Sequence, residues 1–196
     1  MLVVGLTGPT GAGKSSLNET AKKLGFKVID CDKIARVAVQ KGQAGYLALI
    51  KAFGEEILNP DGTINRKELA KRAFSSPQGT ELLNKTLLPH IVELINGEMD
   101  CDKVLLDAPT LFESGVDKMC AGTIAVLADR NIRLERIMER DLLESEAAML
   151  RMNAGKPDEF YLENADYTVY NNGQTNEFKN EFTGIIKNIL KENNYG

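Results

Sequence analysis

Five short apolar runs alternate with stretches of helical periodicity along the chain. Short apolar runs bounded by glycine or polar residues are typical of buried strands. The expected strands are residues 2–6, 26–29, 103–106, 122–127 and 167–170. Apolar positions repeat at helical spacing over residues 178–190, and a helical stretch of residues 14–24 follows the first strand. Strands that alternate with helices predict an α/β fold with a five-stranded, mostly parallel sheet flanked by helices.

About seventy residues between the second and third strands have helical periodicity and no strand pattern. Gly54 is expected to end one helix, and the turn pattern Asn-Pro-Asp-Gly follows at residues 59–62. Asn65 has the pattern of a helix N-cap, with Glu68 three residues on as the partner of a capping box. Ser76-Pro77 opens a further helix. The pattern therefore predicts a helical insert in the α/β domain.

A charged helical stretch covers residues 131–151, between the fourth and fifth strands, and has no strong apolar face. Arg133, Arg136 and Arg140 are spaced three and four residues apart, which places them on one face of a helix. Such a face can close over a triphosphate and stabilise developing charge. Because glutamates are interleaved with the arginines, a solvated charged face is the alternative interpretation.

The segment from Gly8 to Ser15 carries the clearest chemical signal. It reads Gly-Pro-Thr-Gly-Ala-Gly-Lys-Ser and matches the phosphate-loop pattern G-x-x-x-x-G-K-[ST] at every fixed position. It also lies between a predicted strand and a predicted helix, which is the context that the motif requires. Backbone N–H groups of such a loop bind phosphate, the lysine reaches the β- and γ-phosphates, and the serine hydroxyl can ligate Mg²⁺. The expected nucleotide-binding residues are Gly8, Gly11, Ala12, Gly13, Lys14, Ser15 and Ser16.

Acidic residues follow two of the other strands. Asp30 and Asp32 leave the second strand, and an extended chain there would point both side chains to one side. One of them could accept the proton of an attacking hydroxyl or hold Mg²⁺ through water, while the alternative is a helix N-cap. Asp107 ends the third strand, as a carboxylate that supports Mg²⁺ does in phosphate-loop enzymes, although many strands end in aspartate.

Composition narrows the classes of protein. The chain has 196 residues with 43% hydrophobic and 27% charged residues, which is typical of one globular domain. Its net charge of −4 argues against a general nucleic-acid or membrane-surface binder. The single histidine, His90, excludes a His/Cys metal cluster and is more typical of a structural residue. Three cysteines without a CxxC pair, no signal-peptide pattern and no apolar run near ~20 residues predict a cytoplasmic protein.

Taken in order, these motifs resemble the dephospho-CoA kinase family of phosphate-loop kinases over nearly the whole chain. The phosphate loop is followed by Leu24-Gly25 and by Val28-Ile29-Asp30-Cys31-Asp32. Further on come Phe53-Gly54, Asp61-Gly62, Asn65-Arg66, Leu69 and Phe74 in the insert. The segments Pro109-x-Leu111-Phe112-Glu113, Arg136-x-x-x-Arg140-Asp141, Ala165-Asp166 and Asn172-Gly173 complete the resemblance. The order and spacing of these segments are specific, whereas only the phosphate loop is specific by itself.

The resemblance implies ATP-dependent phosphorylation of the 3′-hydroxyl of dephospho-CoA, the last step of coenzyme A biosynthesis, with Mg²⁺ held by Ser15 and Asp107. It makes Asp32 the general base, with Lys14 and Arg140 in the catalytic set and Arg136 and Arg140 at the nucleotide. It also implies one phosphate-loop kinase domain over residues 1–196, monomeric or weakly self-associating. The expected parts are a core of 1–31, 101–130 and 156–196, an acceptor-binding insert of 32–100 and a lid of 131–155.

Three positions depart from the family pattern. Leu88 holds the position of the usual insert histidine, with His90 as a candidate replacement, and Thr110 and Gly155 replace the usual leucine and glutamine. These departures keep another small-molecule kinase, acting on a nucleoside, nucleotide or shikimate-like alcohol, as an alternative. A nucleotide-switch protein would need an Asn-Lys-x-Asp motif, and residues 84–87 read Asn-Lys-Thr-Leu. An inactive nucleotide-binding protein is disfavoured by the intact Lys14, Ser15 and Asp32.

Overall fold

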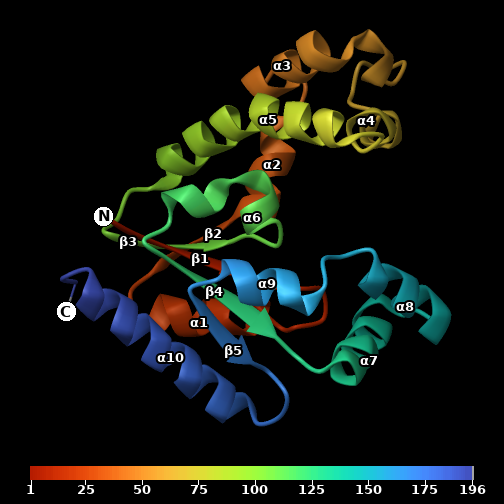
Figure 1. The fold of residues 1–196 in the computed structure, drawn as a ribbon. Helices are drawn as coiled ribbons and strands as arrows, with labels where there is room; N and C mark the ends of the chain where they lie inside the picture. The colour runs from red at the N-terminus through yellow and green to blue at the C-terminus, as the bar shows by residue number, and fades with distance from the viewer. Residues whose placement is uncertain (196) are drawn as a thin grey trace. The chain divides into compact units, whose positions relative to one another are not determined.

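A five-stranded parallel sheet carries the first of two compact units in a computed structural model that describes residues 1–195. This unit comprises residues 1–29, 101–112 and 117 onward (Figure 1). The strands are β1 (Leu2–Thr7), β2 (Lys27–Asp30), β3 (Lys103–Asp107), β4 (Gly122–Leu127) and β5 (Tyr167–Tyr170). Their order in the sheet is β2-β3-β1-β4-β5. The five predicted strands are therefore confirmed, each to within about one residue at either end.

Register places β1 in the middle of the sheet. Val4 pairs with Leu105 of β3 on one side and with Gly122 of β4 on the other, and both pairings are parallel. β1 and β4 are buried along their whole length, which explains why they appear in the sequence as nearly continuous apolar runs. In an open parallel sheet, ligands bind beyond the carboxyl ends of the strands, so the segment after β1 lies where a binding site is expected.

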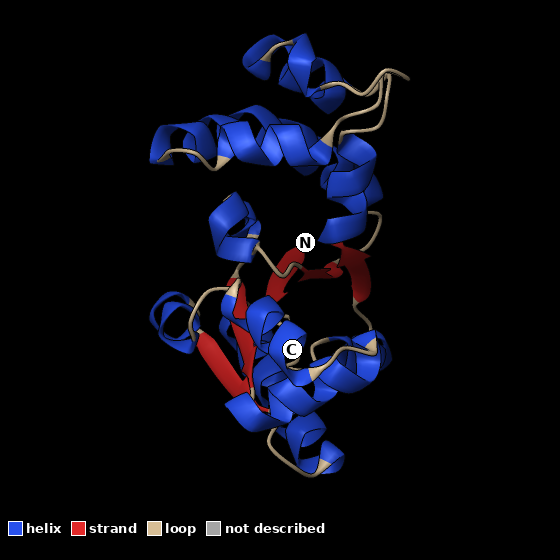
Figure 2. Ribbon diagram, turned by 90° about the vertical axis from the view of Figure 1, so that its right-hand side faces the viewer, coloured by secondary structure: helices blue, strands red, loops and turns tan. Residues whose placement is uncertain are grey.

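Helices cover both faces of this sheet (Figures 1 and 2). On one face α1 (Ser15–Lys23) and α10 (Thr175–Glu192) pack through Leu17 and Phe182 against Leu6 and Ile124. On the other face Tyr161 of α9 (Asp158–Asn164) packs against Ala125 and Leu127, the residues of β4 that follow Ile124 and Val126 of the first core. Alternate β4 residues thus serve two cores, as the two-residue period of a strand requires.

The charged stretch that was expected as one helix forms two. α7 (Arg130–Asp141) ends at Leu142, which has a left-handed backbone (φ 54°), and α8 (Ser145–Asn153) follows. The expectation that this stretch lacks an apolar face is also wrong, because Ile137, Ala148 and Met152 form a buried cluster between the two helices. The single-helix pattern failed because a left-handed turn at leucine has no sequence signature.

The second compact unit consists of residues 30–100 with 113–116. Its helices are α2 (Cys31–Ala38), α3 (Ala44–Phe53), α4 (Arg66–Ala73) and α5 (Pro77–Glu98). α5 packs against the other three, and the short helix α6 (Leu111–Ser114) ends in this unit. Two short 3-10 turns cover Glu55–Ile57 and Val116–Met119. The first turn belongs to the second unit, and the second turn belongs to the first unit except for Val116. None of the helices described combines the length and the apolar character that a bilayer crossing requires.

Local signals in this unit are confirmed with one exception. Gly54 ends α3 with a positive φ of 85°, and the side chains of Asn65 and Ser76 cap α4 and α5. The expected capping box is only half formed. Asn65 accepts a hydrogen bond from the Glu68 backbone N–H, but the Glu68 carboxylate pairs with Arg72 at 2.8 Å. A charged partner one turn away binds the carboxylate more strongly than a neutral backbone N–H does.

Candidate active site

The phosphate loop lies directly after β1, and its backbone can be built only with glycine at key positions. Gly8 has a φ of +139°, and a Cβ added there would lie 2.1 Å from the backbone oxygen of Val126. Gly13 has a φ of +93°, and a Cβ there would lie 2.2 Å from Asn171 Nδ2. Both the dihedral angle and the space therefore exclude any side chain, which is the structural reason for the glycines of the motif.

Asn171 holds the loop from the end of β5. Its Nδ2 donates a 2.8 Å hydrogen bond to the Ala12 oxygen, and this side chain is buried. Arg136 donates to the Asn171 backbone oxygen at 3.0 Å and to the oxygens of Gly11 and Ala12 at 3.4 Å. Asn171 and Arg136 thus donate hydrogen bonds to carbonyl oxygens of the loop and hold its backbone in place. Sequence patterns do not single out Asn171, although a polar residue directly after a predicted strand is the signal that could identify it.

Lys14 and the two serines lie where the loop becomes α1. Lys14 is the N-cap residue of α1, and its ammonium donates a 2.8 Å hydrogen bond to the Gly8 oxygen. Ser15 is the first helical residue and is exposed, and Ser16 donates to the Gly13 oxygen at 2.8 Å. The ammonium and the amino end of α1 together make this position electropositive, which suits an anionic ligand.

The predicted arginine face of α7 does lie against the loop. Arg133 Nε donates to the Thr10 oxygen at 3.2 Å, and a Cβ on Gly11 would lie 2.7 Å from the Arg133 backbone oxygen. Arg133 is only 5% exposed and forms an ion pair with Asp158 of α9. Arg133 and Arg136 are therefore fixed in place by protein contacts, so the solvated-face alternative does not describe them.

Arg140 lies further along the same face and is more accessible. Its guanidinium donates to both carboxylate oxygens of Asp141 at 2.9 Å and to the Thr10 hydroxyl at 3.4 Å. Arg151 of α8 pairs with the same Asp141 carboxylate at 2.9 Å. The hydrogen bond from Arg140, strengthened by its charge and that of Arg151, lowers the pKa of Asp141. The hydrogen bond with Asp141 likewise raises the pKa of Arg140.

Asp107 ends β3, and its carboxylate is held by α1. Asn18 Nδ2 donates a 2.9 Å hydrogen bond to Asp107 Oδ2. Asn18 follows Ser15 by three residues, so the two side chains lie on the same face of α1. In the part of the chain that the structure describes, the buried Asn18 Oδ1 has no hydrogen-bond partner.

The two aspartates after β2 differ from the expected geometry. The chain does not stay extended, because α2 begins at Cys31. Asp30 is the N-cap of this helix and accepts a 3.0 Å hydrogen bond from the Lys33 backbone N–H. Asp32 is exposed in the first turn of α2. Both belong to the second compact unit, whereas the phosphate loop belongs to the first.

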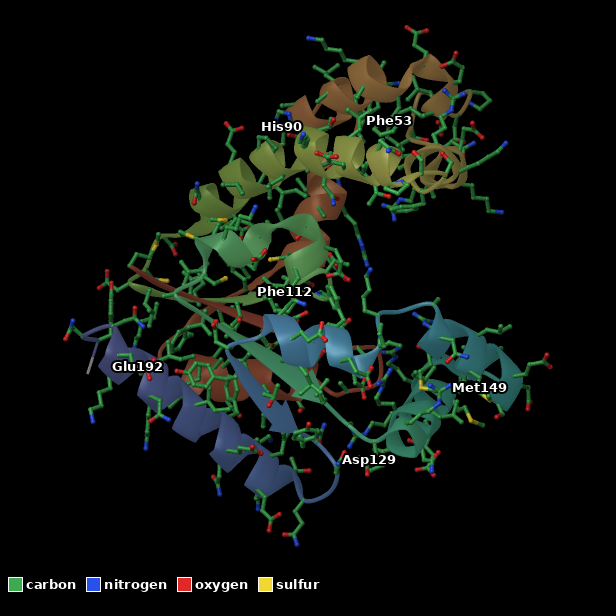
Figure 3. All side chains as sticks on the ribbon, viewed as in Figure 1. Phe53, His90, Phe112, Asp129, Met149 and Glu192 are labelled. Carbon is green, nitrogen blue, oxygen red and sulfur yellow. The ribbon has the colours of Figure 1, made fainter. Side chains whose placement is uncertain are left out.

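His90 lies on α5 in the second unit (Figure 3) and is partly buried. The His90 Cβ lies 3.5 Å from the position that a Cβ on Gly45 of α3 would take. His90 therefore lies where α3 and α5 pack against each other. Leu88 is also partly buried, within 3.4 Å of a Cβ added to Gly115. Glu113 has one buried carboxylate oxygen without a partner among the described residues.

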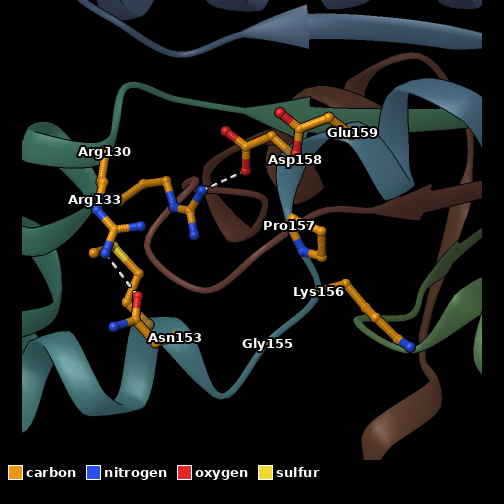
Figure 4. Close-up of a pocket in the computed structure, with 9 residues that line it drawn as sticks. Arg130, Arg133, Asn153, Gly155, Lys156, Pro157, Asp158 and Glu159 are labelled. Atoms are coloured by element: carbon orange, nitrogen blue, oxygen red, sulfur yellow. Dashed lines mark hydrogen bonds and ion pairs between the residues drawn. The ribbon is translucent and has the colours of Figure 1, made fainter.

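A pocket of about 380 Å³ opens between α7, the end of α8 and the segment before α9 (Figure 4). Arg130 donates to Asn153 Oδ1 at 2.7 Å across it, and Arg133 and Asp158 lie on its wall. Lys156 also lines it, with its ammonium 5.1 Å from the centre of the Phe160 ring. Phe160 in turn packs edge-on against Phe112 at 6.0 Å. Cationic groups thus extend from the phosphate loop into this pocket.

Comparison with known proteins assigns the chain to a family. A family model described as dephospho-CoA kinase matches residues 2–177. The chain belongs to the dephospho-CoA kinase family. This family match includes residues 30–100 and 113–116 of the second compact unit and the first unit as far as the start of α10. The family is one of kinases, so the chain is an ATP-dependent phosphotransferase.

Individual dephospho-CoA kinases are similar over almost their full length. The Corynebacterium efficiens dephospho-CoA kinase is 37% identical over 97% of this chain and 98% of its own length. The dephospho-CoA kinase of Oryza sativa subsp. japonica is 35% identical over 96% of this chain and 85% of its own length. The dephospho-CoA kinase structure from Campylobacter jejuni superimposes with a TM-score of 0.61 at 29% identity, covering 97% of this chain and 98% of that one.

Two further solved structures share the fold. A Thermus thermophilus protein superimposes with a TM-score of 0.76 at 27% identity and covers 95% of this chain and 97% of its own. Shikimate kinase from Acinetobacter baumannii superimposes with a TM-score of 0.54 at 19% identity, over 98% of this chain and 94% of that one. At that identity the likeness concerns the fold alone. The predicted phosphate-loop kinase fold is confirmed.

Proposed function

We propose that this protein transfers the γ-phosphoryl group of ATP to the 3′-hydroxyl of dephospho-CoA, giving CoA and ADP. The observation that carries the proposal is the family match over residues 2–177. A phosphate loop alone is shared by many nucleotide-binding proteins, but this match extends through the helical second unit as well. Full-length similarity to dephospho-CoA kinases from bacteria and plants supports the same reaction.

The phosphate loop is proposed to bind the donor. Gly8, Gly11, Ala12, Gly13 and Ser16 would supply backbone and hydroxyl donors around the phosphates, and Lys14 would reach the β- and γ-phosphates. The contacts of Asn171 and Arg136 with loop carbonyls support this role, because they hold the loop in shape before any ligand binds. A preorganised site loses less free energy to reorganisation during the reaction.

Arg140 is the best candidate for a mobile cation at the donor. Its side chain is about half exposed, in contrast to the buried Arg133. We infer that Arg140 moves from Asp141 toward the triphosphate, while Arg136 stays at the loop. Residues 131–155 would then act as the lid that excludes water from the transferred group.

The residues present fit a magnesium ion. Mg²⁺ prefers oxygen ligands and retains several waters, so it needs only one or two protein groups. The Ser15 hydroxyl and the Asp107 carboxylate would provide them, and the 2.9 Å hydrogen bond from Asn18 already orients that carboxylate. When bound, the ion neutralises charge that develops on the β- and γ-phosphates.

Asp32 is proposed as the general base. It would accept the proton of the ribose 3′-hydroxyl as that oxygen bonds to the γ-phosphorus and the bond from phosphorus to the bridging β,γ-oxygen breaks. Support comes from the family resemblance of Val28-Ile29-Asp30-Cys31-Asp32 and from the exposure of the Asp32 side chain. Asp30 caps α2 by accepting a hydrogen bond from the Lys33 backbone N–H, so its carboxylate has a structural role.

The acceptor would bind residues 32–100, with His90 as a candidate contact. The expected substrates are then ATP and dephospho-CoA, and no binding to nucleic acid or to a membrane is expected. A cytoplasmic enzyme that is monomeric or weakly self-associating remains the prediction for its cellular state. The position of Leu88 and His90 keeps a kinase for another alcohol as the alternative.

Coupled measurement of ADP release tests the proposal. The protein is assayed with ATP and Mg²⁺ against dephospho-CoA and a panel of nucleosides, nucleoside monophosphates and shikimate. We expect ADP release that depends on dephospho-CoA, with a product identical to CoA by mass and chromatography. No ADP release with dephospho-CoA, together with turnover of another alcohol of the panel, would contradict the proposed acceptor. It would leave the assignment of a kinase fold unchanged.

A further inference from the structure

Asn18 is on the same helix as Ser15 and hydrogen-bonds Asp107, the two groups that are proposed to hold the metal, and the family motif does not explain it. On α1 it follows Ser15 by three residues and therefore shares its face of the helix. Its amide nitrogen donates to Asp107 at the carboxyl end of β3, across 89 positions of sequence. One side chain thus connects the start of α1 with the carboxylate of the neighbouring strand.

The hydrogen bond determines which way the amide faces. A carboxylate only accepts hydrogen bonds, so the nitrogen of Asn18 must face Asp107 and the oxygen must face away. That oxygen is buried and has no partner among the residues described. Buried oxygens without partners are unfavourable and uncommon, and each one calls for an explanation.

A purely structural role explains only half of this arrangement. An asparagine retained to join α1 to β3 would be expected to satisfy both ends of its amide within the protein. Here only the nitrogen is satisfied, and the free acceptor lies on the side chain that also orients the carboxylate. The bond to Asp107 is thus kept at the cost of an unsatisfied buried oxygen, which points to a role for the carboxylate that Asn18 orients.

We propose that Asn18 is a positioning residue of the magnesium site: its nitrogen fixes the Asp107 carboxylate in the orientation that would hold the ion. This inference rests on the proposed function and specifies how the donor site recognises its ion. Groups that orient metal ligands typically change metal affinity about 10- to 100-fold when they are removed. Asn18 acts through Asp107, so it is not itself a catalytic residue.

Binding of Mn²⁺, followed by its electron paramagnetic resonance signal, tests this directly. The full-length protein is saturated with a non-hydrolysable ATP analogue, and Mn²⁺ is titrated into wild type, Asn18→Ala and Asn18→Ser. We expect Asn18→Ala to raise the Mn²⁺ dissociation constant about 10-fold and Asn18→Ser, which retains a hydroxyl, to raise it less. Affinity for metal-free ATP, measured in EDTA, should change less than about 2-fold because the phosphate loop is untouched.

A double-mutant cycle separates positioning from general damage to α1. If Asn18 acts through Asp107, then Asn18→Ala adds little to the loss of Mn²⁺ affinity caused by Asp107→Asn. Glu19→Gln is the control, since Glu19 is the next residue on α1, is exposed and pairs with Lys22 at 2.6 Å. It should leave Mn²⁺ binding unchanged.

Two outcomes would overturn the inference. One is an unchanged Mn²⁺ dissociation constant in both folded Asn18 variants, and the other is an equal loss of metal-free ATP binding. Neither outcome bears on the acceptor. Conversely, a wild-type protein that ignores dephospho-CoA would contradict the proposed function and leave the metal-binding result standing.

Discussion

The side-chain amide of Asn171 donates a 2.8 Å hydrogen bond to the backbone oxygen of Ala12, joining the end of β5 to the phosphate loop across 159 positions of sequence. Asn171 also receives Arg136 on its own backbone and side-chain oxygens, at 3.0 and 3.3 Å. The loop is therefore supported by a polar network in addition to the packing of Ala12 in the apolar core. Such a network specifies one conformation when every member is satisfied.

Removing the Asn171 amide should loosen the loop. Asn171→Ala leaves the Ala12 oxygen without this partner, so we expect the free energy of unfolding to fall by about 1–3 kcal/mol. The ATP dissociation constant should rise several-fold because the loop is less preorganised. Denaturant unfolding and calorimetric titration measure the two effects. Asn172→Ala, which removes exposed hydrogen bonds to Asp129, should cost less; equal losses would show that the loop contact is unimportant.

Gly8 should tolerate no side chain. In Gly8→Ala, the methyl group would meet the Val126 oxygen at 2.1 Å, and the backbone would keep a φ of +139°. We expect a loss of at least about 2 kcal/mol in unfolding free energy, or loss of ATP binding if the loop shifts instead. Gly173→Ala is the matched control, because a Cβ there meets nothing within 4 Å. Thermal unfolding and ATP titration distinguish the two variants, and a neutral Gly8→Ala would contradict the observed geometry.

Substitutions of Asp30 and Asp32, the two aspartates after β2, should affect activity differently. Asp32→Asn removes the proposed base and should lower kcat by about 10²- to 10⁴-fold with little change in the KM for ATP. Asp30→Asn keeps an N-cap side chain on α2, since asparagine caps helices as well as aspartate does. It should retain most activity. Steady-state kinetics test both, and an unchanged kcat in Asp32→Asn would exclude it as the base.

Arg133 should matter mainly for stability. It is buried beside its partner Asp158, so Arg133→Met leaves Asp158 unpaired and removes the contact with the Thr10 oxygen. We expect the free energy of unfolding to fall by about 3 kcal/mol. This is the lower end of the cost of breaking a buried ion pair, because Asp158 is partly exposed. Combining it with Asp158→Leu should cost less than the sum of the single changes. Urea unfolding of the four proteins gives the coupling, and strict additivity would mean that the pair does not interact.

Acid should weaken the contacts of Asp141. Its pKa lies below the ordinary value because of the hydrogen bond from Arg140, so its stabilising contribution is complete above the unfolded pKa of about 3.9. That contribution is lost as the pH falls through the lowered pKa. The difference in unfolding free energy between wild type and Asp141→Asn should therefore be constant from pH 7 to about 5 and shrink below about 4. A difference that changes around neutral pH would assign the titration to another group.

Much of this protein is determined by local sequence. The strand boundaries follow from short apolar runs between polar or glycine residues, and the caps at Asn65 and Ser76 follow from the hydrogen-bonding capacity of their side chains. The phosphate loop is readable for the same reason, because its glycines meet a backbone requirement within eight consecutive residues. The arginine face of α7 also follows from spacing alone, since helical periodicity decides which side chains align.

Contacts between distant residues were decided only by the tertiary structure. Asn171 meets Ala12 over 159 positions, Asn18 meets Asp107 over 89, and Arg133 meets Asp158 over 25. No local pattern states which polar groups will meet at the carboxyl ends of neighbouring strands, because the order of strands in the sheet differs from their order along the chain. The sequence by itself thus determined the elements, the phosphate loop and the chemistry available. The sheet order decided which side chains support that loop and which carboxylate is held beside it.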